Sequence, residues 1–130
     1  ILNDTDPAPD DGAKLEGRLF IEKIYALMDS HIADSGFKVE AFGQSIGLSR
    51  VQLYRRIKEQ TGYSPNELLR VYRLQKAKKL LSTTDLAVAE VAYRVGFSSP
   101  AYFTKCYREF YKELPTAFLK RMALKNEDSL

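Results

Sequence analysis

The 130-residue sequence contains one histidine, one cysteine and no tryptophan. A single cysteine cannot form an internal disulfide, which is typical of a reducing compartment and predicts a cytoplasmic location. His31 and Cys106 are far apart along the chain and no other Cys or His is present, so we predict neither a Cys–His catalytic pair nor a metal site. A glycine-rich phosphate loop is also missing. We therefore expect no enzyme activity and no cofactor.

Long hydrophobic runs are also missing. No apolar stretch approaches the roughly 20 residues needed to cross a bilayer, and no signal-peptide pattern opens the chain. The first residue is Ile rather than Met. We therefore expect a fragment of a longer protein, whose missing amino-terminal part contains a sensor or receiver domain and any surface for dimerisation.

Negative charge is concentrated at the beginning of the chain. Residues 1–17 have a net charge of −4, whereas residues 18–130 have a net charge of +7. Between residues 50 and 80, nine Lys and Arg residues are opposed only by Glu59 and Glu67. A local excess of this kind favours a polyanionic partner such as nucleic acid, although charge alone is equally typical of a solvated helix face.

The spacing of apolar residues predicts an all-α fold of about seven helices. Residues 1–17 are rich in Asp, Pro and Gly, which is typical of a linker or disordered arm. From Leu19 to Ile32 apolar residues recur every three or four positions and predict one amphipathic helix that ends near Ser35 and Gly36. No later segment alternates as a strand would, and residues 18–130 are predicted to form one domain.

An internal repeat is the most informative feature. The segment Val39–Leu69 aligns with the segment Val88–Leu119. The offset is 49 up to the serine after the glycine, which pairs Gly47 with Gly96 and Ser49 with Ser98. One residue is then inserted, and the offset becomes 50, which pairs Arg55 with Lys105.

Each repeat has the pattern of a helix-turn-helix. A short helix is followed by Gly47 or Gly96, which tolerates the positive φ of a sharp turn. Ser49 and Ser98 are predicted to cap the next helix. The sequence therefore predicts one helix-turn-helix at about 39–61, a second at about 88–111, and a linker helix at about 65–81.

The second helix of each repeat has an outward face with matching basic residues. Arg55 and Lys105 are placed to donate to guanine, and apolar Val51, Pro100 and Ala101 to contact thymine methyls. Lys58 and Arg108, one turn further on, suit phosphates. The predicted base-contacting residues are Arg50, Val51, Gln52, Tyr54, Arg55, Ser99, Pro100, Ala101, Thr104 and Lys105; the predicted phosphate-contacting residues are Lys58, Arg73, Lys76 and Arg108.

The predicted linker helix contributes Arg73 and Lys76 to this set. Seventeen helical residues span roughly 25 Å. A strut of this length could hold two reading helices about one turn of DNA apart, roughly 34 Å, so that they enter successive major grooves.

The chain from about Val39 to Lys120 resembles the DNA-binding domains of the AraC/XylS family. The resemblance rests on GLSRVQLYRRIKEQTG, SPNELLRVYRLQKAKKLL and VAEVAYRVGFSSPAYFTKCYREF. It implies seven helices, double-stranded DNA bound in two neighbouring major grooves, and transcription regulation, with RNA polymerase as a further partner. The preceding segment LFIEKIYALMDSHIADSGFKVEAFG is similar to the variant fused to receiver domains in hybrid two-component sensors of gut bacteria, whose parent proteins can be membrane-anchored.

Two positions depart from the family pattern. Residues 112–115 read Lys-Glu-Leu-Pro where the family usually has Gly-x-Ser/Thr-Pro, so we expect the last helix to start with a different geometry. Lys38 stands where a hydroxyl cap is common and weakens the start of the first repeat.

The main alternative is a protein-interaction module without direct DNA readout. Tyrosine is common at protein interfaces, and this chain has candidates at Tyr54, Tyr72, Tyr93, Tyr102 and Tyr111. Several of these positions are needed for the core of a repeat. RNA is a weaker alternative, because two regularly spaced helix hairpins suit duplex major grooves better than splayed single strands.

Overall fold

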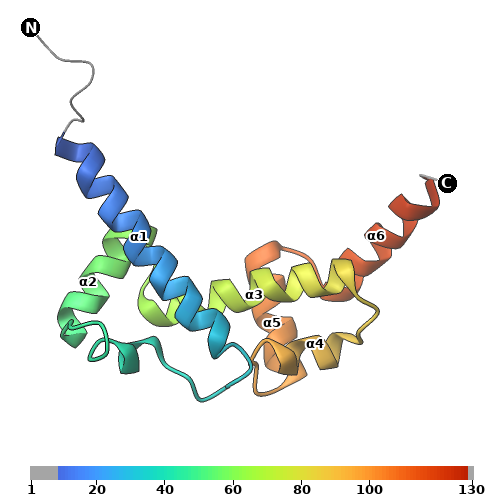
Figure 1. Cartoon of the computed structure of the whole chain (residues 1–130). Helices are drawn as coiled ribbons and strands as arrows, with labels where there is room; N and C mark the ends of the chain where they lie inside the picture. The colour runs from blue at the N-terminus through green and yellow to red at the C-terminus, as the bar shows by residue number, and fades with distance from the viewer. Residues whose placement is uncertain (1–8, 129–130) are drawn as a thin grey trace, which may run out of the picture. The chain divides into compact units, whose positions relative to one another are not determined.

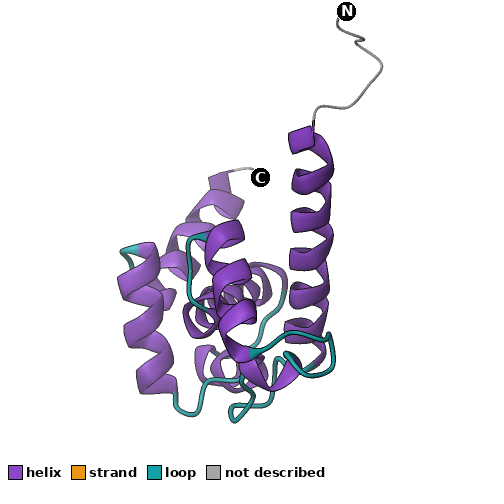
Figure 2. Cartoon of the chain, turned by 90° about the vertical axis from the view of Figure 1, so that its left-hand side faces the viewer, coloured by secondary structure: helices purple, strands orange, loops and turns teal. Residues whose placement is uncertain are grey.

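The computed structural model of the chain describes residues 9–128, all of whose regular elements are helices (Figures 1 and 2). Six α-helices and one 3-10 helix are present in this range, in agreement with the predicted all-α fold. Their bounds are α1 Pro9–Ser30, η1 Val39–Phe42, α2 Arg50–Thr61, α3 Pro65–Thr83, α4 Val88–Arg94, α5 Pro100–Tyr111 and α6 Pro115–Asp128.

The chain forms two compact units, each with one helix-turn-helix. The first unit contains α1, η1 and α2 and ends within α3, at Leu68. The second unit contains residues 31–37 and everything from Leu69 onward. The helix α3 is therefore shared in sequence by both units, and it runs two residues beyond the predicted end at Leu81.

Helix α1 is longer at its start and shorter at its end than predicted. It begins at Pro9, a residue type that suits the first turn of a helix, so residues 9–17 are helical, whereas their composition predicted a linker or disordered arm. Residues 1–8 lie outside the described range. The buried face comprises Phe20, Ile24 and Met28. The helix ends at Ser30, and residues 31–37 belong to the second unit.

The helix before the turn differs between the repeats. In the first repeat it is only the 3-10 helix η1, and Lys38 provides no side-chain cap, as expected from its side chain. In the second repeat it is the α-helix α4. Gly43 occupies the position of Ala92, and glycine costs about 1 kcal/mol relative to alanine in a helix interior. The cap does not account for the difference, because Ala87 before α4 provides no side-chain cap hydrogen bond either. The glycine is the residue that disfavours a full α-helix in the first repeat.

The serine that caps the second helix of the repeat is the predicted one only in the first repeat. The Ser49 side chain accepts a hydrogen bond from the Gln52 backbone N–H at 3.1 Å, as predicted. In the second repeat the cap is Ser99, which accepts from the Tyr102 N–H at 3.2 Å. The prediction of Ser98 was wrong, because the inserted residue precedes the cap rather than following it.

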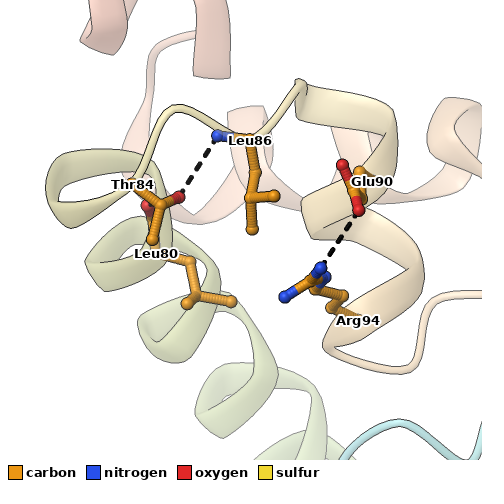
Figure 3. Close-up of polar contacts among 5 residues, drawn as sticks. All are labelled: Leu80, Thr84, Leu86, Glu90 and Arg94. Atoms are coloured by element: carbon orange, nitrogen blue, oxygen red, sulfur yellow. Dashed lines mark hydrogen bonds and ion pairs between the residues drawn. The ribbon is translucent and has the colours of Figure 1, made fainter.

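Short-range polar contacts fix the entry to α4 (Figure 3). The Thr84 hydroxyl donates to the Leu80 carbonyl at 2.6 Å and accepts from the Leu86 N–H at 3.3 Å, which satisfies backbone groups where α3 ends. On α4, Arg94 pairs with Glu90 at 3.1 Å. Both members of this pair are at least half exposed, so it contributes little to stability.

The helices α2 and α5 end in the same way despite different residues. Gly62 follows α2 with φ +79° and Lys112 follows α5 with φ +61°, and each N–H donates to a carbonyl four residues earlier. The following helices then start at the equivalent buried residues Pro65 and Pro115. The geometry expected to differ at Lys112 is therefore conserved between the repeats.

Lys112 is the one non-glycine residue with positive φ among residues 9–128. A left-handed conformation costs a β-carbon-bearing residue about 1 kcal/mol or more, whereas glycine adopts it without strain and loses more backbone entropy on folding. We expect Lys112→Gly to raise the free energy of unfolding by about 0.5 kcal/mol, measured by chemical denaturation. Lys120→Gly, inside α6, serves as a control and should lower it by about 1 kcal/mol. Equal losses in the two variants would contradict this account of the turn.

Candidate nucleic-acid interface

The outward face of α2 carries the predicted contact residues of the first repeat. Leu53 and Ile57 are fully buried and fix the inward face. Val51 is 66% exposed and Tyr54 is 50% exposed. The other predicted residues on this helix are also exposed: Arg50, Gln52, Arg55 and Lys58.

Gln52 has a structural role besides any contact with a partner. Its side-chain oxygen accepts a hydrogen bond from the Ser49 N–H at 2.8 Å, which completes a capping box. The amide group of Gln52 is therefore held in place at the amino end of α2, and its NH₂ group is the part left for donating to a base edge.

The equivalent helix of the second repeat, α5, presents a matching but narrower exposed face. Ala101, Lys105 and Arg108 are exposed, and Phe103 and Tyr107 on the opposite side are fully buried. Three of the predicted contact residues are only half-exposed: Ser99, Pro100 and Thr104. The basic residues that the repeat aligns, Arg55 and Lys105, are exposed on equivalent helices.

Tyr102 belongs to this face but was not among the predicted contact residues. Its side chain is 46% exposed, and its ring lies 5.8 Å from the Phe97 ring, which supports it at the amino end of α5. The offset of 50 aligns Tyr102 with Gln52. This alignment is the sequence signal that could have identified it.

Arg73 lies in surroundings that disfavour the phosphate contact predicted for it. It is only 9% exposed, and its guanidinium donates to the Asp34 carbonyl at 2.7 Å within the second unit. Burial lowers the pKa of Arg73, and the Asp34 carboxylate partly offsets this shift. The side chain stays charged at ordinary pH and fastens residues 31–37 to the unit.

Lys76 on α3 is half-buried, with its ammonium 5.6 Å from the centre of the Tyr72 ring. The neighbouring Lys78 lies 4.4 Å from the Tyr111 ring. Aromatic faces attract cations at such distances. Part of the positive charge of α3 therefore serves packing, and the phosphate contact predicted for Lys76 stays a prediction.

The two residues considered for catalysis or metal binding, Cys106 and His31, both pack against other residues of the domain. Cys106 is buried. The His31 ring stacks on Phe37, with 4.8 Å between ring centres. Across the described range no three His, Cys, Asp or Glu side chains come together as metal ligands would. None of the helices in that range has the length and apolar character of a membrane span.

Comparison with known proteins places the chain in a family. A family described as a helix-turn-helix domain matches residues 43–121. Histidine kinase P4 from Formosa agariphila is 36% identical over 101 residues, which cover 78% of this chain and 7% of the kinase. The chain therefore spans less than a tenth of that relative.

Two solved structures share the fold. The DNA-binding domain of the transcriptional factor AdpA, described in complex with a target DNA, matches with a TM-score of 0.72 and 30% identity over 80% of this chain and 93% of that domain. A Chromobacterium violaceum transcriptional regulator with an AraC-type DNA-binding domain matches with a TM-score of 0.72 and 25% identity, over 89% and 97% of the two chains. The family match extends from the first repeat to the end of the second and covers more than half of the sequence, so the chain belongs to the AraC/XylS-type helix-turn-helix domains.

Proposed function

We propose that this domain binds specific double-stranded DNA sequences and is the output part of a transcription regulator. The observation that carries the proposal is the equivalence of α2 and α5. Each follows a glycine turn, buries its inward face completely, and exposes a basic residue at the same position, Arg55 or Lys105. Two such helices in one chain are suited to two successive major grooves.

The proposed division of roles follows from side-chain chemistry. Arg55 can donate two hydrogen bonds to guanine O6 and N7, and Lys105 can approach the same atoms as a single donor. Lys58 and Arg108, one turn later on their helices, are proposed to contact phosphates together with Lys76. These phosphate contacts would give affinity and register, and the base contacts would give specificity.

The similar proteins support the proposed role as the output domain of a transcription regulator. AdpA is described bound to a target DNA, and the similarity to a histidine kinase fits an output domain fused to a two-component sensor. We propose that the parent protein carries a sensor or receiver domain, that any dimerisation uses regions outside residues 9–128, and that RNA polymerase is a partner of the bound regulator. The proposed location of this domain is the cytoplasm, including the case of a membrane-anchored parent.

The dependence of binding on salt separates DNA recognition from a protein-interaction module. Neutralised phosphates release counterions, so the affinity for duplex DNA should fall by roughly tenfold or more between about 50 and 200 mM salt if three phosphates are contacted. Fluorescence anisotropy with labelled duplexes would measure this. Absence of duplex binding at low salt would contradict the proposal and favour the alternative based on exposed tyrosines such as Tyr93.

A further inference from the structure

A groove with a volume of about 320 Å³ lies beside the amino end of α2, within the first unit. It is lined by Glu40, Arg50, Val51 and Tyr54. Val51 and Tyr54 provide an apolar floor that is largely exposed. Glu40 comes from η1 rather than from the recognition helix. An acidic residue thus lies on the face proposed to approach a polyanion.

The two charged side chains of the groove are available to a ligand. Among residues 9–128, neither the Glu40 carboxylate nor the Arg50 guanidinium takes part in a hydrogen bond or an ion pair. Glu40 is half-buried and Arg50 is exposed. The groove therefore offers the unpaired acceptors of Glu40 on η1, the unpaired donors of Arg50 on α2, and an apolar surface.

This combination matches the major-groove edge of a C·G pair. Guanine presents two acceptors, O6 and N7, which suit an arginine, and its partner cytosine presents the N4 amino donor, which suits a carboxylate. The apolar floor suits the methyl group of a neighbouring thymine. A carboxylate facing only phosphates would be repelled, whereas a carboxylate facing cytosine N4 has a partner.

We propose that Glu40 is a specificity-determining residue that accepts from cytosine N4 while Arg50 donates to the guanine of the same base pair. The inference rests on the proposed function and adds to it a named base pair and a residue outside the recognition helix. The second repeat has neither the carboxylate nor the guanidinium at these positions, because Ala89 aligns with Glu40 and Pro100 aligns with Arg50. The C·G preference therefore belongs to the block of the site that α2 contacts.

The test compares the wild-type domain with Glu40→Ala and Arg50→Ala on duplexes that vary one base pair at a time. Both variants should lose preference for C·G at the same position, by about tenfold relative to T·A. Glu40→Ala should bind the duplexes with other pairs at that position at least as well as wild type does, because a negative charge has been removed. Glu90→Ala, which removes a carboxylate already paired with Arg94 on α4, should keep every preference.

Three outcomes decide the matter. Loss of C·G preference in Glu40→Ala at the position that Arg50→Ala also affects would support the proposal. An equal gain in affinity on all duplexes would overturn it, since Glu40 would then only repel phosphate. A wild-type domain with no sequence preference at all would overturn the proposed function and this inference together. Unchanged unfolding midpoints of the variants would show that folding does not cause the difference.

Discussion

Replacing Gly96 by alanine is expected to lower the free energy of unfolding by about 3 kcal/mol, whereas the same change at Gly47 is expected to cost about 1 kcal/mol. The two glycines occupy the same position in the two helix-turn-helix repeats, and both have positive φ, +91° and +74°. Alanine is strained in this conformation at either site, which accounts for the shared part of the loss.

The difference comes from the space around each glycine. A β-carbon at Gly47 would have no atom within 4 Å apart from its own neighbours in the chain. A β-carbon at Gly96 would collide with the Ile32 carbonyl oxygen and lie 2.8 Å from the Arg73 Nε. The first obstacle is a backbone atom and the second belongs to a buried guanidinium, so relieving the clash requires residues 31–37 to move away from the rest of the second unit.

Chemical denaturation of the two variants would measure these losses. Hydrogen exchange of residues 31–37 provides a second readout, because Gly96→Ala should expose this segment and Gly47→Ala should leave it protected. Equal destabilisation by the two substitutions would mean that residues 31–37 do not pack against the Gly96 turn as described.

Replacing Arg55 by alanine is expected to weaken binding to the preferred duplex by about 1–3 kcal/mol and to relax the preference at one base pair. The reason is geometric and chemical. Arg55 is exposed on the face opposite Leu53 and Ile57, and an arginine that donates twice to guanine discriminates against the other bases. Comparing affinities for duplexes that vary one position at a time would measure the effect.

Lys58→Ala is the matched control, because it removes a basic residue one turn further along the same exposed face of α2. A phosphate contact carries no sequence information, so this variant should bind all duplexes more weakly by a similar factor. The slope of log affinity against log salt concentration should also become shallower, by about one released counterion. If both variants lost affinity by the same factor on every duplex, the assignment of Arg55 to base recognition would be wrong.

The repeat allowed much of the fold to be predicted from the sequence. The turn glycines, the cap at Ser49 and the buried faces of α2 and α5 depend on contacts between residues close in sequence, and such contacts leave a spacing pattern. The helical start of α1 at Pro9 was missed because Asp, Pro and Gly there have the composition of a linker.

The features that were missed concern contacts between residues distant in sequence. Arg73 lies in a run of basic residues and looks like a surface charge, but it is buried because Asp34, 39 residues earlier, supplies a carbonyl acceptor. Glu40 was not considered because it precedes α2, and only the folded chain places it in one groove with Arg50. Spacing within a helix identifies a face, but not which other segments lie beside it.

Selection of bound duplexes from a random DNA pool, at low and at moderate salt, tests the central claim most directly. Paired reading by α2 and α5 predicts an asymmetric site with two short blocks of preferred sequence, centred about 10 base pairs apart. Binding without any sequence preference, or no binding at either salt concentration, would contradict the claim that this domain recognises specific DNA through two helices.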